Sequence, residues 1–319
     1  MKNYIVTGGA GFIGSVVAKR LIGSGAKVYI IDDLSTGFER NVPAGAILYK
    51  ANISSYSEID KLTIPHTIDA VFHLAAQSSG EASFDDPLRD ADVNYKGTYN
   101  ILSLAKKTGS KRFIYASSMS VYGEAAGKSK VSEESDCHPS SYYGCNKLAS
   151  EKMINVFAGG AGIAHTILRL FSVYGPGQNM NNMKQGIVSI YLSYLLKDNP
   201  VHVKGSLDRL RDLIYIDDVA SAFTGCVENK SSFGRTFNIG TGRKTTVREL
   251  LNVLLEVYGK EDFKKWVHSE GSTPGDVKGC VADITKARKI LNWKPEHDLR
   301  KGVGNMKEWV DDTKHLWVK

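Results

Sequence analysis

A glycine-rich turn near the start of the chain has the residue types that bind a dinucleotide. Residues 7–14 (TGGAGFIG) contain both a G-x-G-x-x-G and a G-x-x-G-x-x-G spacing. The turn follows a strand-like run and opens a helical pattern, which is the context that such a motif needs. Glycines let a pyrophosphate approach the backbone, and the N-terminus of the helix offers N–H groups and the positive end of its dipole.

A carboxylate at the end of the second strand-like run indicates which dinucleotide is bound. Asp32 follows the run Lys27–Ile31 and could accept hydrogen bonds from both hydroxyls of an adenosine ribose. A carboxylate at this place would repel a 2′-phosphate, and no Arg or Lys follows before Arg40. The sequence therefore favours NAD over NADP.

A tyrosine and a lysine four positions apart could transfer protons. Tyr143 and Lys147 would lie on one face of a helix. That spacing alone is common, but the serine-rich turn 117–123 (SSMSVYG) directly follows a strand-like run and so belongs at the carboxyl edge of a parallel sheet. A neighbouring ammonium would lower the pKa of the Tyr143 phenol, and the Ser118 hydroxyl could hydrogen-bond the reacting oxygen. Tyr142 does not fit this role, because Asn146 stands four positions after it.

Alternating strands and helices in the first half of the chain must position these residues. The strand-like runs are Tyr4–Thr7, Lys27–Ile31, Ala46–Tyr49, Ala70–Leu74, Arg112–Ala116 and Ala164–Leu170. The amphipathic stretches between them include Ser15–Ser24, Tyr95–Thr108 and Tyr143–Ala158. This alternation predicts an α/β fold of the Rossmann type, with a doubly wound, mostly parallel sheet and helices on both faces.

The second half of the chain has a different pattern, which begins after residues 175–177 (GPG). A loop with Asn and Met, a helix and the run Asp212–Val219 come first. A strand-like piece, Thr236–Ile239, and helices near Val247–Tyr258 and Ile284–Leu291 follow. We expect an NAD-binding domain over residues 1–175, with returning segments near 213–242. A smaller, interleaved α/β domain over 176–319 would bind the substrate.

The composition is that of an ordinary globular protein of 319 residues, which can bury a substantial core. No apolar run reaches the about 18 residues that a membrane span needs, and the first ten residues resemble a core strand rather than a signal peptide, so we expect a cytosolic protein. Four scattered cysteines predict reduced thiols and no metal site. The net charge of +7 is spread along the chain, which favours solvated helix faces over a nucleic-acid groove.

Together these motifs resemble the extended short-chain dehydrogenase/reductase family, in its nucleotide-sugar epimerase/dehydratase branch, and most of all its UDP-glucose 4-epimerases. The similarity runs nearly end to end. Its markers are residues 7–14, 32–37 (DDLSTG), 72–77 (FHLAAQ), 93–98 (VNYKGT), 117–123, 143–147 (YGCNK), 169–176 (RLFSVYGP), 211–212 (RD), 215–219 (YIDDV), 238–240 (NIG), 275–276 (GD) and 282–283 (AD).

The resemblance implies a tightly held NAD and a nucleotide-sugar substrate. Tyr143 would be the base, Lys147 would tune it and anchor the nicotinamide ribose, and Ser118 would bond the sugar hydroxyl. The implied cofactor-binding residues are Gly8, Gly11, Phe12, Ile13, Gly14, Asp32, Asp33, Ser35, Thr36, Gly37, Asn52, Ile53, Leu74, Ala75, Ala76, Asn94, Ala116, Tyr143, Lys147 and Leu170. The implied substrate-binding residues are Gln77, Ser118, Ser120, Tyr143, Ser172, Arg211 and Cys280, with Arg211 on the pyrophosphate.

The turn after Ser118 favours one reaction within this branch. Similar sugar 4,6-dehydratases carry an Asp-Glu pair there, and decarboxylases and GDP-mannose dehydratases carry a Glu, whereas this chain has Met119 and Ser120. Because neither is a useful acid, 4-epimerisation becomes the leading interpretation. Tyr143 would remove the proton of the 4-hydroxyl while C4 gives a hydride to NAD, and the rotated 4-keto sugar would take the hydride back on its other face.

Several positions depart from the family pattern and bear on the substrate. Ser172 stands where Asn is frequent, and Thr273 where an Arg is common. Asn52 replaces an Asp that touches adenine, although its amide oxygen could still accept a hydrogen bond. Glu81 belongs to a loop that faces the sugar in this family, and is either a substrate contact or a solvated acid. Cys280 is small where a large Tyr would exclude N-acetyl groups, so we expect turnover of both UDP-glucose/galactose and their N-acetyl forms.

Other functions remain open from the sequence alone. The chain could be a UDP-uronic acid 4-epimerase, a 3,5- or 2-position epimerase, or a 4-keto-sugar reductase of surface-polysaccharide synthesis. It could also be a non-catalytic NAD-binding scaffold, although the intact Ser118, Tyr143 and Lys147 oppose this. The resemblance further implies a homodimer formed by the helices around Leu88–Thr108 and Tyr143–Ala158.

Overall fold

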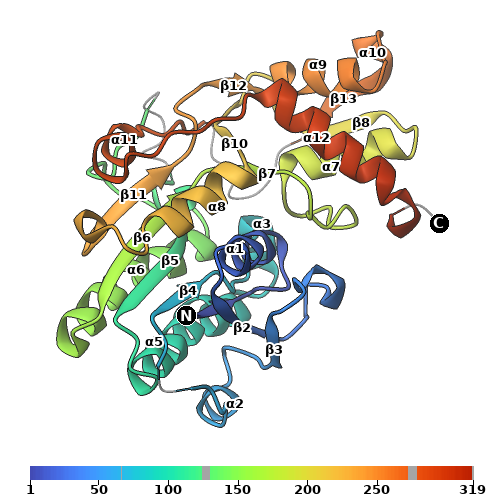
Figure 1. Cartoon of the computed structure of the whole chain (residues 1–319). Helices are drawn as coiled ribbons and strands as arrows, with labels where there is room; N and C mark the ends of the chain where they lie inside the picture. Colours follow the sequence, from blue (N-terminus) through green and yellow to red (C-terminus); the bar gives the residue numbers. More distant parts are fainter. Residues whose placement is uncertain (66, 124–129, 272–278, 318–319) are drawn as a thin grey trace.

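A seven-stranded parallel sheet forms the centre of the computed structural model, which describes residues 1–65, 67–123, 130–271 and 279–317 (Figure 1). Its strand order is β11-β6-β5-β4-β1-β2-β3, and all of its pairings are parallel. The strands are β1 (Asn3–Thr7), β2 (Lys27–Asp32), β3 (Ile47–Lys50), β4 (Ala70–His73), β5 (Arg112–Ser118), β6 (Ala164–Leu170) and β11 (Arg235–Ile239). The doubly wound sheet predicted from the sequence is confirmed.

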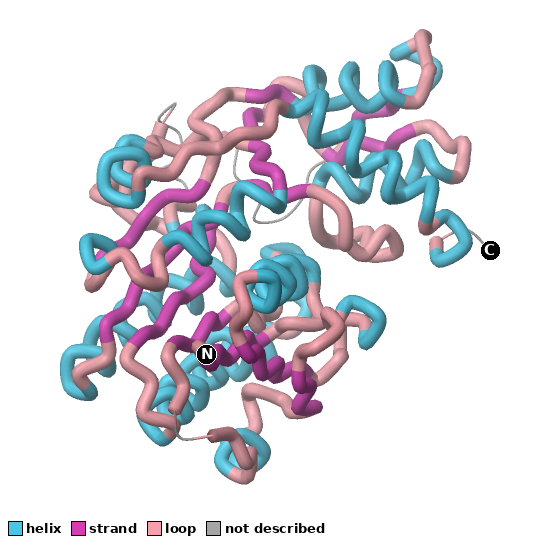
Figure 2. Tube along the Cα trace, in the orientation of Figure 1, coloured by secondary structure: helices cyan, strands magenta, loops and turns pink. Residues whose placement is uncertain are grey.

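Helices cover both faces of this sheet (Figure 2). Because side chains alternate along a strand, Val6 of β1 packs with α1, α8 and α11, whereas its neighbour Ile5 packs with α2, α5 and α6. Both faces are buried, which explains why these strands are nearly continuous apolar runs. The bounds are α1 (Phe12–Gly23), α2 (Tyr56–Asp60), α5 (Gly97–Lys107), α6 (Tyr142–Ala161), α8 (Ile216–Gly225) and α11 (Thr285–Leu291).

A second hydrophobic core lies beside the sheet and is built mainly from the second half of the chain (Figure 1). Its helix α9 begins with a capping box, in which Thr246 and Glu249 satisfy each other's backbone N–H groups. Three separate two-stranded sheets accompany this core: β7 with β10, β9 with β12, and β8 with β13. The bounds are β7 (Ser172–Tyr174), α7 (Ile187–Leu196), β8 (Val201–Lys204), β9 (Leu210–Arg211), β10 (Leu213–Tyr215), β12 (Thr245–Thr246), α9 (Val247–Val257), α10 (Phe263–Trp266), β13 (Val267–Glu270) and α12 (Leu299–Asp312).

The structure corrects some of the predicted elements. The run Asp212–Val219 divides into β10 and the start of α8. The helix expected over Tyr95–Thr108 begins as a π-helical turn, Asp92–Lys96, before α5. Two short helices precede that turn: α3 (Gly80–Asp85) was not predicted, whereas α4 (Pro87–Ala91) overlaps the start of the helical region expected around Leu88–Thr108. The domain boundary at residue 175 remains a prediction.

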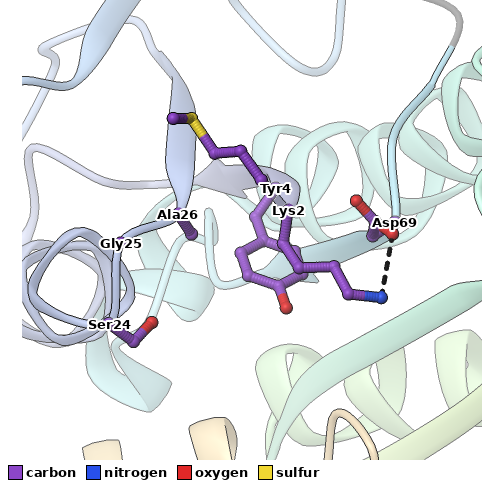
Figure 3. Close-up of a pocket in the computed structure, with 7 residues that line it drawn as sticks. Lys2, Tyr4, Ser24, Gly25, Ala26 and Asp69 are labelled. Carbon is purple, nitrogen blue, oxygen red and sulfur yellow. Dashed lines mark hydrogen bonds and ion pairs between the residues drawn. The ribbon is translucent and has the colours of Figure 1, made fainter.

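A shallow pocket of about 470 Å³ lies at the amino end of the strands (Figure 3). Lys2, just before β1, and Asp69, just before β4, form an ion pair of 3.2 Å in its wall. Ligands of open α/β sheets bind at the carboxyl ends of the strands instead. Within the described ranges, no helix is long and apolar enough to cross a membrane.

Candidate active site

A cavity of about 290 Å³ opens at the carboxyl edge of the sheet, against the second core. The strand ends of β4, β5 and β6, the start of α1 and the N-terminus of α7 all contribute to its wall. The predicted site residues that line it are Phe12, Ile13, Leu74, Ala76, Ala116, Ser118, Ser120, Tyr143, Lys147, Leu170, Ser172 and Arg211. The structure therefore brings together the predicted catalytic residues and part of both predicted binding sets.

The glycine-rich turn has the close backbone packing that a pyrophosphate cradle requires. Gly8 has φ +70°, and a Cβ there would lie 2.7 Å from the nitrogen of Ala75. A Cβ on Gly14 would overlap the carbonyl oxygen of Gly8. Helix α1 begins after Gly11, which provides no side-chain cap, and the first N–H groups of a helix have no intrahelical partner. These residues fit an NAD pyrophosphate.

The carboxylate of Asp32 is fixed by backbone donors at the end of β2. It accepts hydrogen bonds of 2.9 Å from the N–H groups of Ala10 and Leu34, one on each oxygen. Burial raises the pKa of Asp32, and these two hydrogen bonds oppose the rise. Each oxygen keeps a lone pair for a ribose hydroxyl. The next carboxylate, Asp33, instead accepts from the N–H and hydroxyl of Ser35, at 2.9 and 2.6 Å.

Two asparagines of the predicted cofactor set differ in what they offer a ligand. The amide oxygen of Asn52 already accepts hydrogen bonds from the N–H and hydroxyl of Ser54, at 2.9 and 2.8 Å, so the expected acceptor role toward adenine is not supported. Asn94 donates 2.9 Å to the carbonyl of Gln77, whereas its buried Oδ1 has no hydrogen-bond partner among the described residues. Asn94 lies in the π-helical turn, a geometry frequent at functional sites. Ile53 lies in the core and its carbonyl accepts from Asn100.

The predicted catalytic residues come from β5 and the first two turns of α6. Lys147 is buried and donates 2.9 Å to the carbonyl of Ala116, and its Nζ lies 5.9 Å from the ring centroid of Tyr143. Ser118 accepts from the N–H of Ser120 and donates to its hydroxyl, both at 3.1 Å. Ser120 thus orients Ser118 as well as lining the cavity.

Burial moves the pKa values of the tyrosine and the lysine in opposite directions, because it disfavours the charged form of each. It raises the pKa of Tyr143 to about 12, and a hydrogen bond with Ser118 opposes the rise. It lowers the pKa of Lys147 to about 8, and the carboxylates of Asp90 and Glu151 oppose that fall. In the free protein the phenol is therefore neutral near pH 7, and added positive charge beside it is needed for a phenolate.

A buried ion pair holds the strand that carries Ser118. Glu151 accepts from the Ser117 hydroxyl at 2.5 Å and from Arg169 at 2.9 and 2.7 Å. Arg169 also donates 3.0 Å to the hydroxyl of Tyr122. Because Glu151 follows Lys147 by one turn of α6, these contacts fix that helix against β5 and β6.

Asp90 is a site residue that the sequence analysis missed. Its fully buried carboxylate accepts 2.6 Å from the amide of Gln77 and 2.7 Å from the amide of Asn146. Gln77 also donates to the carbonyl of Ser79 and accepts from its N–H. Gln77 was expected to bind substrate, but its amide is used in this network and does not line the cavity.

The predicted phosphate end of the cavity is held by a second buried carboxylate. Arg211 lines the cavity, donates 2.7 Å to the carbonyl of Leu210, and has its pKa lowered by burial to about 10. The next residue, Asp212, accepts from the backbone and hydroxyl of Thr241 and from the N–H groups of Gly242 and Ala282. The segment that carries Arg211 is therefore fixed to two distant loops.

Other substrate positions are placed differently from what was expected. Cys280 is buried with Tyr122 and Phe171, beneath the cavity wall rather than in it, so its effect on the sugar would be indirect. Glu81 does not line the cavity and pairs with Lys204 at 3.3 Å. Thr273 and the motif 275–276 lie outside the described residues.

Two glutamines that the sequence analysis did not name, Gln178 and Gln185, also line the cavity. Gln178 is 7% exposed, and its Oε1 has no hydrogen-bond partner among the described residues. Gln185 donates 2.7 Å to the hydroxyl of Ser78, and both line the same cavity. The sequence signal for Gln178 was its position directly after the GPG turn 175–177. Among the described residues, no cluster of His, Cys, Asp or Glu could hold a metal ion.

Comparisons with known proteins find relatives along almost the whole chain. The sequence model of the NAD dependent epimerase/dehydratase family matches residues 4–240. The crystal structure of a UDP-glucose 4-epimerase from Thermotoga maritima with UDP-glucose is similar with a TM-score of 0.93 and 36% identity, covering 98% of this chain and 99% of that chain. A UDP-glucose 4-epimerase from Thermus thermophilus in complex with NAD has a TM-score of 0.88 and 30% identity, covering 97% and 99%. A UDP-N-acetylglucosamine 4-epimerase from Methanobrevibacter ruminantium has a TM-score of 0.88 and 28% identity, covering 98% and 99%.

Proposed function

Because the chain belongs to the NAD-dependent epimerase/dehydratase family, we propose that it interconverts UDP-sugars that differ at C4. Its substrates would be UDP-glucose and UDP-galactose, together with their N-acetyl forms. The observation that carries the proposal is the placement of Ser118, Tyr143 and Lys147 around one cavity, with Met119 and Ser120 where dehydratases and decarboxylases carry acids. Gly8, Gly14 and Asp32 would hold NAD, the cofactor of this family, which when bound would supply a reversible hydride acceptor for C4.

The residues of this chain would supply the proton chemistry and the orientation. Tyr143 takes the proton of the 4-hydroxyl and later gives it back. Lys147, buried beside it, stabilises the phenolate by its positive charge. Ser118 is oriented by Ser120 and hydrogen-bonds the same sugar oxygen. No net oxidation occurs, so the cofactor is recycled in place.

The nucleotide and the assembly are inferred from separate features. Arg211 is a buried guanidinium in the cavity wall, suited to a pyrophosphate. The similar structures from Thermotoga maritima and Methanobrevibacter ruminantium contain UDP-glucose and UDP-N-acetylmuramic acid, which favours UDP over other nucleotides. A homodimer would form through α4 and α6, where Leu88 and Val156 are each 80% exposed.

The proposal is tested by incubating the enzyme with single UDP-sugars, without added NAD, and identifying the products by NMR. The panel holds UDP-glucose, UDP-galactose, their N-acetyl forms and UDP-glucuronic acid. We expect 4-epimers of the first four sugars and no change in absorbance at 340 nm. Stoichiometric consumption of NADH with a 4-keto sugar would instead identify a reductase. Turnover of UDP-glucuronic acid alone would identify a uronic acid epimerase.

A further inference from the structure

The last described residues of the chain pack against the loop that follows Asp32. Trp317 is buried, and its ring centroid lies 6.4 Å from that of Phe38 at an interplanar angle of 68°. The guanidinium of Arg40 lies 3.8 Å above the ring of Phe38 and 5.4 Å from that of Trp317. These three side chains, which we call the C-terminal clamp, join the last described residues of the chain to the connection between β2 and β3.

Trp317 is held from the side of the second core. Its indole N–H donates 2.9 Å to the hydroxyl of Thr313, which in turn donates 2.6 Å to the carbonyl of Trp309 at the end of α12. The rings of Trp309 and Trp317 also lie 5.7 Å apart. Trp317 belongs to the same hydrophobic core as Met306 and Val310. The clamp is therefore anchored on a packed helix.

Phe38 is linked on its other side to the cofactor turn. Its N–H donates 3.0 Å to the carbonyl of Ala10, and the amide of Asn41 donates 3.1 Å to the same oxygen. The N–H of Ala10 binds the carboxylate of Asp32 at 2.9 Å. A Cβ on Gly37 would lie 2.8 Å from the Ala10 carbonyl oxygen, so the loop already lies tightly on the turn. Direct contacts thus run from Trp317 through Phe38 and Ala10 to Asp32.

We propose that the C-terminal clamp holds the ribose-binding loop closed over bound NAD and slows its release. The exposed side chains of Asp33, Ser35 and Thr36 give this loop little packing of its own. A loop of this kind opens locally at low cost unless other contacts restrain it. Phe38, Arg40 and Trp317 are positioning residues, because they act on the cofactor through the loop. The proposal rests on NAD binding and not on which sugar is turned over.

The test measures how fast the NAD-loaded protein releases its cofactor. Parent and variants are loaded with NAD, freed of excess by gel filtration, and followed with an NAD-consuming trap. We expect Arg40→Ala and Trp317→Ala to release NAD about tenfold faster, as expected for one or two lost cation–π contacts. Trp317→Phe should restore most of the retention. Binding of UDP, measured by calorimetry with NAD in excess, should stay unchanged.

Arg248→Ala is the matched control, because the exposed Arg248 lies over the ring of Phe263 at 5.5 Å, on the outside of the second core. It removes a similar contact without touching the loop, and should leave NAD release at the parent rate. Equal acceleration by Arg248→Ala would attribute the effect to general loosening and overturn the proposal. Parent-like release from Arg40→Ala would also overturn it, and this exposed position decides the matter if Trp317→Ala does not fold.

Discussion

Asn146 donates a hydrogen bond of 2.7 Å to the carboxylate of Asp90, and Lys147 is the next residue in the chain. The contact ties the catalytic turn of α6 to α4. Gln77, in the loop after β4, donates to the other oxygen of the same carboxylate. One buried acid therefore connects three segments that surround Tyr143 and Lys147, and its charge acts on both of them.

Replacing Asp90 with Asn should shift the pH–activity profile toward acid. Burial lowers the pKa of Lys147 to about 8, and Asp90 and Glu151 oppose that fall. Burial raises the pKa of Tyr143 to about 12, a hydrogen bond with Ser118 opposes the rise, and Asp90 adds to it. Removing the carboxylate therefore lowers both pKa values. The other groups near Lys147 are Tyr115 and a neutral His73, which the change leaves in place. The measurement is kcat against pH.

Asp92→Asn provides the control for Asp90→Asn. Asp92 is exposed and pairs only weakly with Lys96, at 3.4 Å. It makes the same change in charge close by in the sequence, and should leave both limbs of the profile where they are. An unshifted profile for Asp90→Asn would show that the carboxylate acts only by holding Gln77 and Asn146.

Tyr143→Phe should abolish turnover while leaving the cofactor bound. Loss of a general base costs about 100-fold to 10,000-fold in rate. The ring is kept, so the cavity keeps its shape and the NAD content of the protein should be unchanged. Tyr142→Phe is the matched control, since that neighbour is half exposed and does not line the cavity. Parent-like activity in Tyr143→Phe would contradict the assignment of the base.

Gln178→Leu should raise KM for the UDP-sugar about fivefold with a smaller change in kcat, because one neutral hydrogen bond contributes about 1 kcal/mol. The unpartnered, buried Oε1 in the cavity wall is the reason to expect a substrate contact there. Gln178→Glu keeps an acceptor at the same place and should recover part of the affinity for a substrate donor. Equal KM values for parent and Gln178→Leu would exclude the contact.

His73 should make the protein sensitive to acid. Burial lowers its pKa to about 3, and its two ring nitrogens are bonded to Thr7 at 2.7 Å and to Thr98 at 3.0 Å. Thr98 donates its hydroxyl proton to Asn94, so it accepts from Nε2, and the ring is satisfied when neutral. Between pH 6.5 and 3 the unfolded chain binds a proton that the folded protein does not, so stability falls as pH falls.

The expected slope from His73 is about 1.4 kcal/mol per pH unit, which urea unfolding at pH 4.5–6.5 can measure. His73→Gln removes the titrating group and should lack that part of the slope, whatever its stability at pH 7. The difference between the two proteins isolates the histidine, since carboxylates titrate in both. Parallel curves would show that His73 is protonated in the folded state.

Leu88→Asp and Val156→Asp should each convert the proposed dimer to a monomer. Both side chains are 80% exposed, near the aromatic contacts of Phe84 with Tyr142 and of Tyr99 with Phe157. A carboxylate buried in an apolar interface without a partner is strongly unfavourable. Sedimentation velocity gives the mass, with Met183→Asp, at an exposed apolar residue in a loop, as the control. A monomeric parent would contradict the proposal.

Local motifs explain how much could be predicted from the sequence. The turn 7–14, Asp32 and the Tyr143–Lys147 pair each lie at or in a strand or helix that the sequence pattern predicts. Their chemical role and their place in the fold could therefore both be predicted. Asp90 could not, because its burial depends on Asn146, 56 positions away. Residues 86–92 (DPLRDAD) look like a solvated, charged helix start. In the second half, β9 and β12 have two residues each, too few for a strand period to be visible.

The late position of strand β11 in the sequence affects how the chain can fold during its synthesis. Strand β11 is an edge strand of the sheet and pairs with β6, yet residues 171–234 separate the two strands. A nascent chain that ends near residue 175 would therefore leave β6 with an unpaired edge and, without α8, one face of the sheet only partly covered. Such fragments are prone to aggregate. The nucleotide-binding sheet becomes complete only after translation has passed residue 239, so the two cores must mature together.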